Sequence, residues 1–114
     1  MELFTLAFWL VASHFVADFQ LQSDFVARNK TPGAAIFWPW VMTAHAALHG
    51  ALVALVLNPL FGLAEFLSHW AIDYGKARGW FGAGAISFNV DQALHLVLKG
   101  VWLALYVALD QAVG

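Results

Sequence analysis

Pairs of polar side chains, each four residues apart, interrupt an otherwise apolar chain. The segment HFVADF contains His14 and Asp18, and HWAIDY repeats the pattern with His69 and Asp73. Residues four apart share one face of a helix, so each pair would place an imidazole beside a carboxylate. These two kinds of side chain together suit zinc, manganese or iron. The spacing therefore predicts helices that present metal ligands.

Two further pairs use the remaining histidines of the chain, in the segments HAALH (residues 45–49) and DQALH (residues 91–95). A carboxylate inside a membrane helix costs at least roughly 2.5–3.5 kcal/mol unless it is paired or lines a polar cavity. Neutral imidazoles cannot offset three aspartates, whereas one or two divalent ions can. The alternative is a hydrogen-bonded network that holds no metal. The predicted ligands are His14, Asp18, His45, His49, His69, Asp73, Asp91 and His95.

The composition indicates which elements position these pairs. Of 114 residues, 62% are hydrophobic and 11% are charged, against about 25% charged in soluble domains. The apolar blocks are long enough for helices of roughly 20 residues that cross a bilayer. We predict an all-α fold, a bundle of four transmembrane helices at about 2–22, 39–57, 60–76 and 90–112, forming one integral membrane domain over 1–114. Asn89 is the expected N-cap of the last helix.

The remaining composition excludes several classes of function. The chain has no cysteine, which excludes a disulfide framework and a thiolate metal site. Its net charge of -2 provides no basic surface for nucleic acid. The composition implies that the protein contacts bilayer lipid. It does not determine whether the protein forms a homo-oligomer.

The basic residues predict the orientation of the bundle. Arg28 and Lys30 follow the first helix, and Lys76 and Arg78 follow the third. The positive-inside rule places these two connections in the cytoplasm and both termini outside. Because the helices alternate in direction, all four polar pairs then lie toward the cytoplasmic end. The repetition also predicts two helix pairs related by a pseudo-two-fold axis along the membrane normal.

Other polar residues extend the predicted site. Glu65 and Lys99 should lie at the same depth in the bundle, beyond the histidines, and form an ion pair. The alternative is that Lys99 extends toward the membrane interface while Glu65 faces a cavity. Gln22 follows Asp18 by four residues and could support a metal ligand through a hydrogen bond, or it could mark the exit into the headgroups. Asp24 and Arg28 should pair on an exposed helical face.

Together, the segments HFVADFQLQSDFVARNK, HAALHG, HWAIDYGKAR and DQALH resemble a family of small bacterial and phage membrane proteins, known as domain of unknown function three-three-zero-seven. The family is similar in style to inner-membrane metal-dependent hydrolases. The resemblance implies a multi-pass protein of the bacterial inner membrane. It also adds Lys76 and Gln92 to the site.

Three functions fit these residues. The first is a membrane-embedded metal-dependent hydrolase acting on a lipid or a phosphoester, in which an aspartate is the general base and a lysine binds the phosphate. The second is transport of a metal ion or protons. The third is a non-catalytic subunit in which a structural metal or a hydrogen-bonded network holds the bundle together. For the hydrolase, the candidate catalytic residues are Asp18, Asp73, Asp91 and Lys76.

Overall fold

The computed structural model describes residues 2–113 and is built from helices, with no strand among these residues. This confirms the predicted all-α class. The elements are α1 (Leu3–Phe15), the π-helix η1 (Val16–Gln20), α2 (Asp24–Asn29), α3 (Trp38–Val56), α4 (Pro59–Ala77) and α5 (Gly84–Val113).

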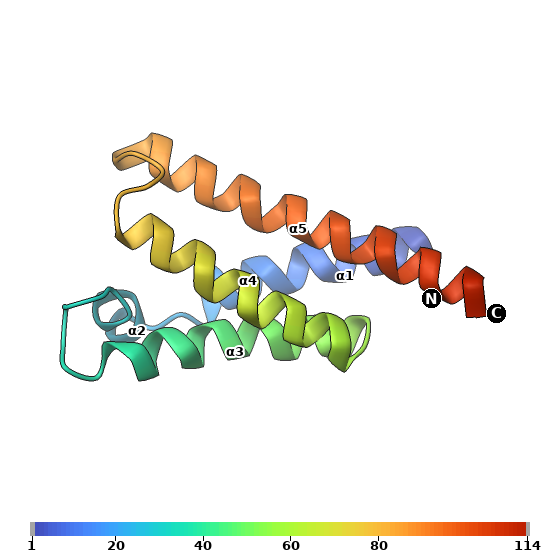
Figure 1. The fold of residues 1–114 in the computed structure, drawn as a ribbon, viewed down its shortest axis with the longest axis horizontal. Helices are drawn as coiled ribbons and strands as arrows, with labels where there is room; N and C mark the ends of the chain where they lie inside the picture. The colour runs from blue at the N-terminus through green and yellow to red at the C-terminus, as the bar shows by residue number, and fades with distance from the viewer. Residues whose placement is uncertain (1, 114) are drawn as a thin grey trace.

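The four long helices α1, α3, α4 and α5 run alongside one another (Figure 1). The short helix α2 and the α4–α5 connection lie at one end of the bundle, whereas the α3–α4 turn and both ends of the described chain lie at the other (Figure 1).

α3 and α4 approach each other closely at two glycines. A Cβ added to Gly50 would lie 2.7 Å from the carbonyl oxygen of Gly62, so the backbones meet where neither residue has a side chain.

Local sequence signals explain several helix boundaries. The Asn58 side chain accepts a hydrogen bond of 3.1 Å from the backbone N–H of Phe61, and Pro59 occupies the first turn of α4. The Ser23 hydroxyl accepts a hydrogen bond of 3.2 Å from the backbone N–H of Val26 and caps α2. These caps fix the α3–α4 turn and separate α2 from the helix before it.

Two boundaries differ from the predicted ones. The helix expected over 2–22 is α-helical only to Phe15 and continues as the π-helix η1 to Gln20. The last helix begins at Gly84 and not near residue 90, so Asn89 lies inside α5 and does not cap it. The segment between the last two predicted helices is therefore irregular only between Ala77 and Gly84. The α5 helix gains more than a turn, which brings Ser87 to the end of the bundle near α4.

The distribution of side chains is inverted relative to a soluble protein. Among the described residues, ten polar or charged side chains are buried but only eight hydrophobic ones, while large apolar residues such as Leu55 and Ile36 are 81% and 97% exposed. Within residues 2–113, three segments are long and apolar enough to cross a membrane: Leu3–Gln20, Trp38–Val56 and Gly84–Ala112. These features suggest a membrane protein. α4 is not among the three spans, and it carries Glu65, Asp73 and Lys76.

Candidate metal centre

The four polar pairs meet in one place inside the bundle. Each of the four long segments contributes one pair, and seven of the eight side chains are buried, with Asp18 partly exposed. The structure therefore brings together every residue predicted as a metal ligand. They are His14 and Asp18 from α1 and η1, His45 and His49 from α3, His69 and Asp73 from α4, and Asp91 and His95 from α5.

Two groups of ligand atoms are close enough to hold a metal ion. One consists of Asp18, His45, His49 and His69, and the other of His69, Asp73 and His95; the ligand atoms of each group lie within 4.8 Å of one another. His69 belongs to both groups, so the two candidate positions adjoin. This arrangement could hold one ion or a neighbouring pair.

The first group is centred on the Asp18 carboxylate. Asp18 Oδ1 lies 2.9 Å from His49 Nε2 and 3.4 Å from His45 Nε2. His45 Nε2 also lies 3.6 Å from Asp73 Oδ2, which belongs to the second group. The two histidines of α3 therefore face aspartates from two other helices.

The second group is centred on Asp73. Its Oδ1 lies 3.2 Å from His95 Nε2, and its Oδ2 lies 3.3 Å from His69 Nε2. The imidazole rings also stack: the centroids of His49 and His69 are 3.7 Å apart, and those of His69 and His95 are 4.0 Å apart. His69 thus lies between one ring from α3 and one ring from α5.

Several buried polar atoms in this cluster have no hydrogen-bond partner. They include Nε2 of His45, both ring nitrogens of His69 and Oδ1 of Asp91. An unsatisfied buried donor or acceptor costs about 1–3 kcal/mol, so a native structure rarely leaves several together. A divalent cation would accept lone pairs from these atoms, because imidazole and carboxylate are its ordinary ligands. The residues therefore fit a metal ion.

Gln92 connects three members of the cluster. Its Oε1 lies 2.9 Å from His14 Nε2, and its Nε2 donates to Asp18 Oδ2 at 2.8 Å and to Asp91 Oδ2 at 3.3 Å. His14 and Asp91 are outside the two groups of ligand atoms, although His14 Nε2 is only 3.7 Å from Asp18 Oδ2. Gln92 of α5 thus orients His14 and Asp18 of the neighbouring α1–η1 segment as well as Asp91 of its own helix.

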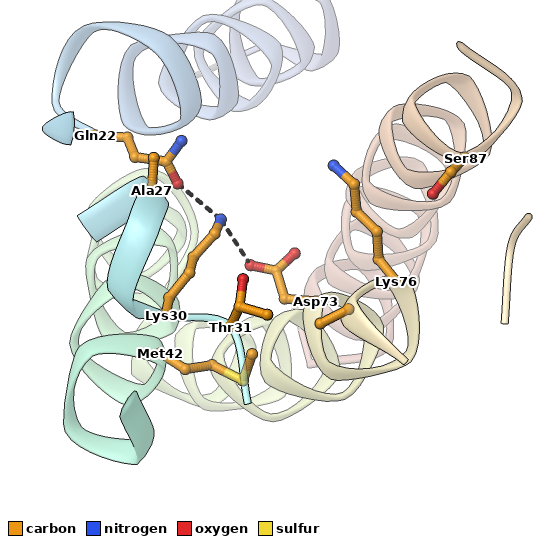
Figure 2. A pocket seen from close by; sticks show the side chains of 9 residues that line it. Gln22, Ala27, Lys30, Thr31, Met42, Asp73, Lys76 and Ser87 are labelled. Carbon is orange, nitrogen blue, oxygen red and sulfur yellow. Dashed lines mark hydrogen bonds and ion pairs between the residues drawn. The ribbon is translucent and has the colours of Figure 1, made fainter. Parts of the chain in front are cut away.

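One wall of the cluster opens into a cavity of about 330 Å³ at the end of the bundle where α2 lies. Figure 2 shows Asp73 between Lys30 and Lys76, with Ser87 on the α5 side. Lys30 Nζ donates to Gln22 Oε1 at 2.7 Å and lies 3.5 Å from Asp73 Oδ2. Lys76 Nζ lies 3.4 Å from Asp91 Oδ2. Each lysine therefore contacts a different aspartate of the cluster.

Lys30 is a residue of the site that the sequence did not predict, since its charge indicated only the orientation of the bundle in the membrane. It lies beyond α2, in the connection to α3, and no helical spacing relates it to Asp73. The one feature of the sequence that could have indicated this role is that Lys30 ends the segment HFVADFQLQSDFVARNK, one of the segments that carry the family resemblance. Gln22 Oε1 accepts a hydrogen bond from this lysine, and its support of a metal ligand stays a prediction.

Below the cluster, the predicted pair between Glu65 and Lys99 is confirmed. Lys99 Nζ donates to Glu65 Oε1, and both side chains are almost fully buried. The indole N–H of Trp102 lies 3.4 Å from the other carboxylate oxygen, Oε2 of Glu65. The predicted exposed pair between Asp24 and Arg28 also forms, at 3.7 Å.

Comparison with known families places the chain in one of them. The family model described as "Protein of unknown function (DUF3307)" matches residues 6–112. Because the match covers most of the chain, the chain belongs to this family. No curated protein and no solved structure matches the chain.

Proposed function

We propose that this member of the family is a membrane-embedded, metal-dependent hydrolase whose substrate is a phosphoester, either a lipid or a lipid-like molecule. The centre would hold one or two divalent ions, of zinc, manganese or iron, among the ligands of α1, α3, α4 and α5. The observation that carries the proposal is the position of Asp73. It is a member of one ligand group and at the same time lines a cavity that opens at the end of the bundle.

The proposed membrane arrangement has four crossings, with α4 as the fourth. The charged side chains of α4 support this, because they face partners inside the bundle: Glu65 meets Lys99, and Asp73 meets His95. Charged groups in membrane segments are tolerated in such pairs. Arg28, Lys30, Lys76 and Arg78 would lie in the cytoplasm of a bacterium, with both termini outside its inner membrane. The paired segments HFVAD and HWAID support a pseudo-two-fold axis along the membrane normal.

The open cavity favours a catalytic metal over a structural one. Structural sites are closed by protein ligands, whereas catalytic sites keep a position for water or substrate. When bound, the metal would supply an activated water and polarise an oxygen of the substrate. Asp73, at the cavity wall, is placed to accept a proton from that water. The water oxygen would bond to phosphorus, the bond from phosphorus to the ester oxygen would break, and the proton would pass to the departing oxygen.

The buried pair below the centre argues against transport. A pathway across the bundle would have to pass Lys99 and Glu65, which contact each other directly and are almost completely buried. The surface hollows lined by α1 and α3 are apolar, unlike the cavity at the α2 end. This difference supports access to the site from the α2 end.

Metal analysis and a hydrolysis assay on the same detergent-purified protein test the proposal. We expect stoichiometric zinc, manganese or iron in the wild type and hydrolysis of at least one member of a panel of phospholipids and soluble phosphoesters. Asp73→Asn should abolish hydrolysis. Asp24→Asn is the matched control, because this carboxylate is exposed and contacts Arg28. Bound metal with no hydrolysis of any phosphoester would favour a structural metal, and absence of metal would favour a hydrogen-bonded network.

A further inference from the structure

The cavity in front of the metal centre has basic side chains on two sides. Lys30, from the segment after α2, and Lys76, from the last turn of α4, both line it, and Asp73 lies between them (Figure 2). Their side chains are 21% and 36% exposed. Both ammonium groups are therefore accessible to a molecule that enters the cavity. The hydroxyls of Thr31 and Ser87 belong to the same lining.

The charges of the centre require an anion once metal is bound. Asp18, Asp73 and Asp91 carry three negative charges, and Lys30 and Lys76 carry two positive ones. Glu65 and Lys99 neutralise each other below. Because imidazole ligands bind metal in their neutral form, one divalent ion leaves a net charge of about +1 and two ions leave about +3 by this count. An anionic group in the cavity would offset that excess.

The two lysines keep donors available for such an anion. Lys30 contacts Gln22 at 2.7 Å and Asp73 at 3.5 Å, and Lys76 contacts Asp91 at 3.4 Å. An ammonium group has three N–H donors, so each lysine has at least one donor left. An ammonium group is also a common phosphate ligand. The hydroxyls of Thr31 and Ser87 add neutral donors that suit phosphate oxygens.

We propose that this cavity is a phosphate-binding site in which Lys30 and Lys76 hold a phosphate group from opposite sides, with Thr31 and Ser87 as additional donors. The inference rests on the proposed function, and it names the group of the substrate that is recognised. The cavity volume of about 330 Å³ is at the lower end of ordinary ligand pockets, roughly 300–1,000 Å³. It therefore admits the phosphate and adjoining atoms, while any long chain would extend outside.

Calorimetric titration of inorganic phosphate into the metal-loaded protein in detergent tests this site. We expect saturable binding that Lys30→Gln and Lys76→Gln each weaken at least about tenfold, the effect of losing a hydrogen bond from a charged group. Lys30→Arg should retain most of the affinity. Arg78→Gln is the charge-matched control, since Arg78 is exposed near the same end, over the Tyr74 ring at 5.9 Å. It should change the affinity less than twofold.

The metal content of each sample separates this inference from the proposed function. Bound metal without phosphate binding, wild-type affinity in the Lys30→Gln/Lys76→Gln double variant, or an equal loss in Arg78→Gln would overturn the phosphate site alone. Phosphate binding without any bound metal would overturn only the proposed function. Circular dichroism and size-exclusion profiles matching the wild type establish that each variant is folded.

Two arms of the experiment identify the source of the phosphate. The titration is repeated in nanodiscs of phosphatidylcholine alone and in nanodiscs that also contain phosphatidic acid. If phosphatidic acid blocks inorganic phosphate, the site accepts a lipid headgroup. If both nanodiscs bind phosphate equally and glycerol phosphate competes, the site accepts a soluble phosphoester. Either result supports the cavity as a phosphate site.

Discussion

Lys99 donates a hydrogen bond to Glu65 in the interior of the bundle, and neither side chain has appreciable contact with solvent. Removing one partner leaves the other charge buried and uncompensated, which destabilises proteins by about 3–5 kcal/mol. We expect Lys99→Met to lower the free energy of unfolding by about this amount, measured by denaturant titration in mixed micelles. The double variant Lys99→Met/Glu65→Gln should recover most of the loss. A single variant as stable as the wild type would show that Glu65 is satisfied without Lys99.

His69 belongs to both groups of potential ligands, whereas His14 belongs to neither. We therefore expect His69→Ala to remove nearly all bound metal, measured by mass spectrometry of the purified protein. His14→Ala should retain most of it, because His14 Nε2 contacts Gln92 at 2.9 Å. Equal metal content in the two variants would contradict the assignment of His69 as the shared ligand.

Gln92 donates to Asp18 and contacts His14, so it should orient ligands without binding metal itself. Removing such a supporting group typically lowers metal affinity 10–100-fold. We expect Gln92→Ala to weaken metal binding by about this factor in a competition titration against a chelating dye, with the stoichiometry unchanged. A Gln92→Ala protein that binds no metal at any concentration would make Gln92 a ligand or a requirement for folding.

Removing metal should lower the thermal stability of the whole bundle. The carboxylates of Asp18 and Asp73 and the unpaired nitrogens of His45 and His69 would lose their metal ion, and ligand binding to the folded state stabilises it by mass action. We expect a chelator to lower the midpoint of thermal unfolding and stoichiometric metal to restore it. His69→Ala serves as the control, because its midpoint should not respond to the chelator.

The close approach of α3 and α4 should depend on two glycines. A Cβ at Gly62 would lie 2.6 Å from the Ala54 Cβ, and one at Gly50 would lie 2.7 Å from the Gly62 carbonyl oxygen. We expect Gly50→Ala and Gly62→Ala each to destabilise the fold by about 1–3 kcal/mol through overpacking. Gly100→Ala is the matched control, since nothing lies within 4 Å of the added Cβ. This variant should be neutral or slightly stabilising, because alanine favours helix.

The sequence predicted the centre better than it predicted the elements that form it. Helical spacing and alternating helix direction were enough to bring four pairs to one level and to place Glu65 against Lys99 below them. Helical spacing does not reveal the π-helix η1, which contains Asp18 and its contacts to His49 of α3 and Gln92 of α5. π-helical turns of this kind often occur at functional sites.

The remaining differences have similar causes. The last helix was predicted to begin near residue 90, yet α5 begins at Gly84, whose φ of +58° is one that glycine adopts readily. Lys30 reaches Asp73 from a connection whose path no periodic pattern determines. Both features depend on contacts between segments far apart in the chain, and both line the cavity through Ser87 and Lys30.

The helix α4 carries three charged side chains, and α5 supplies a partner for each of them. Glu65 meets Lys99, Asp73 meets His95, and Lys76 meets Asp91. In the proposed arrangement with four crossings, α4 alone would present these groups to the lipid while α5 is still being synthesised, at about 2.5–3.5 kcal/mol for each central charge. Under that proposal, insertion of α4 should wait for α5, so that the two helices leave the translocon together as a hairpin.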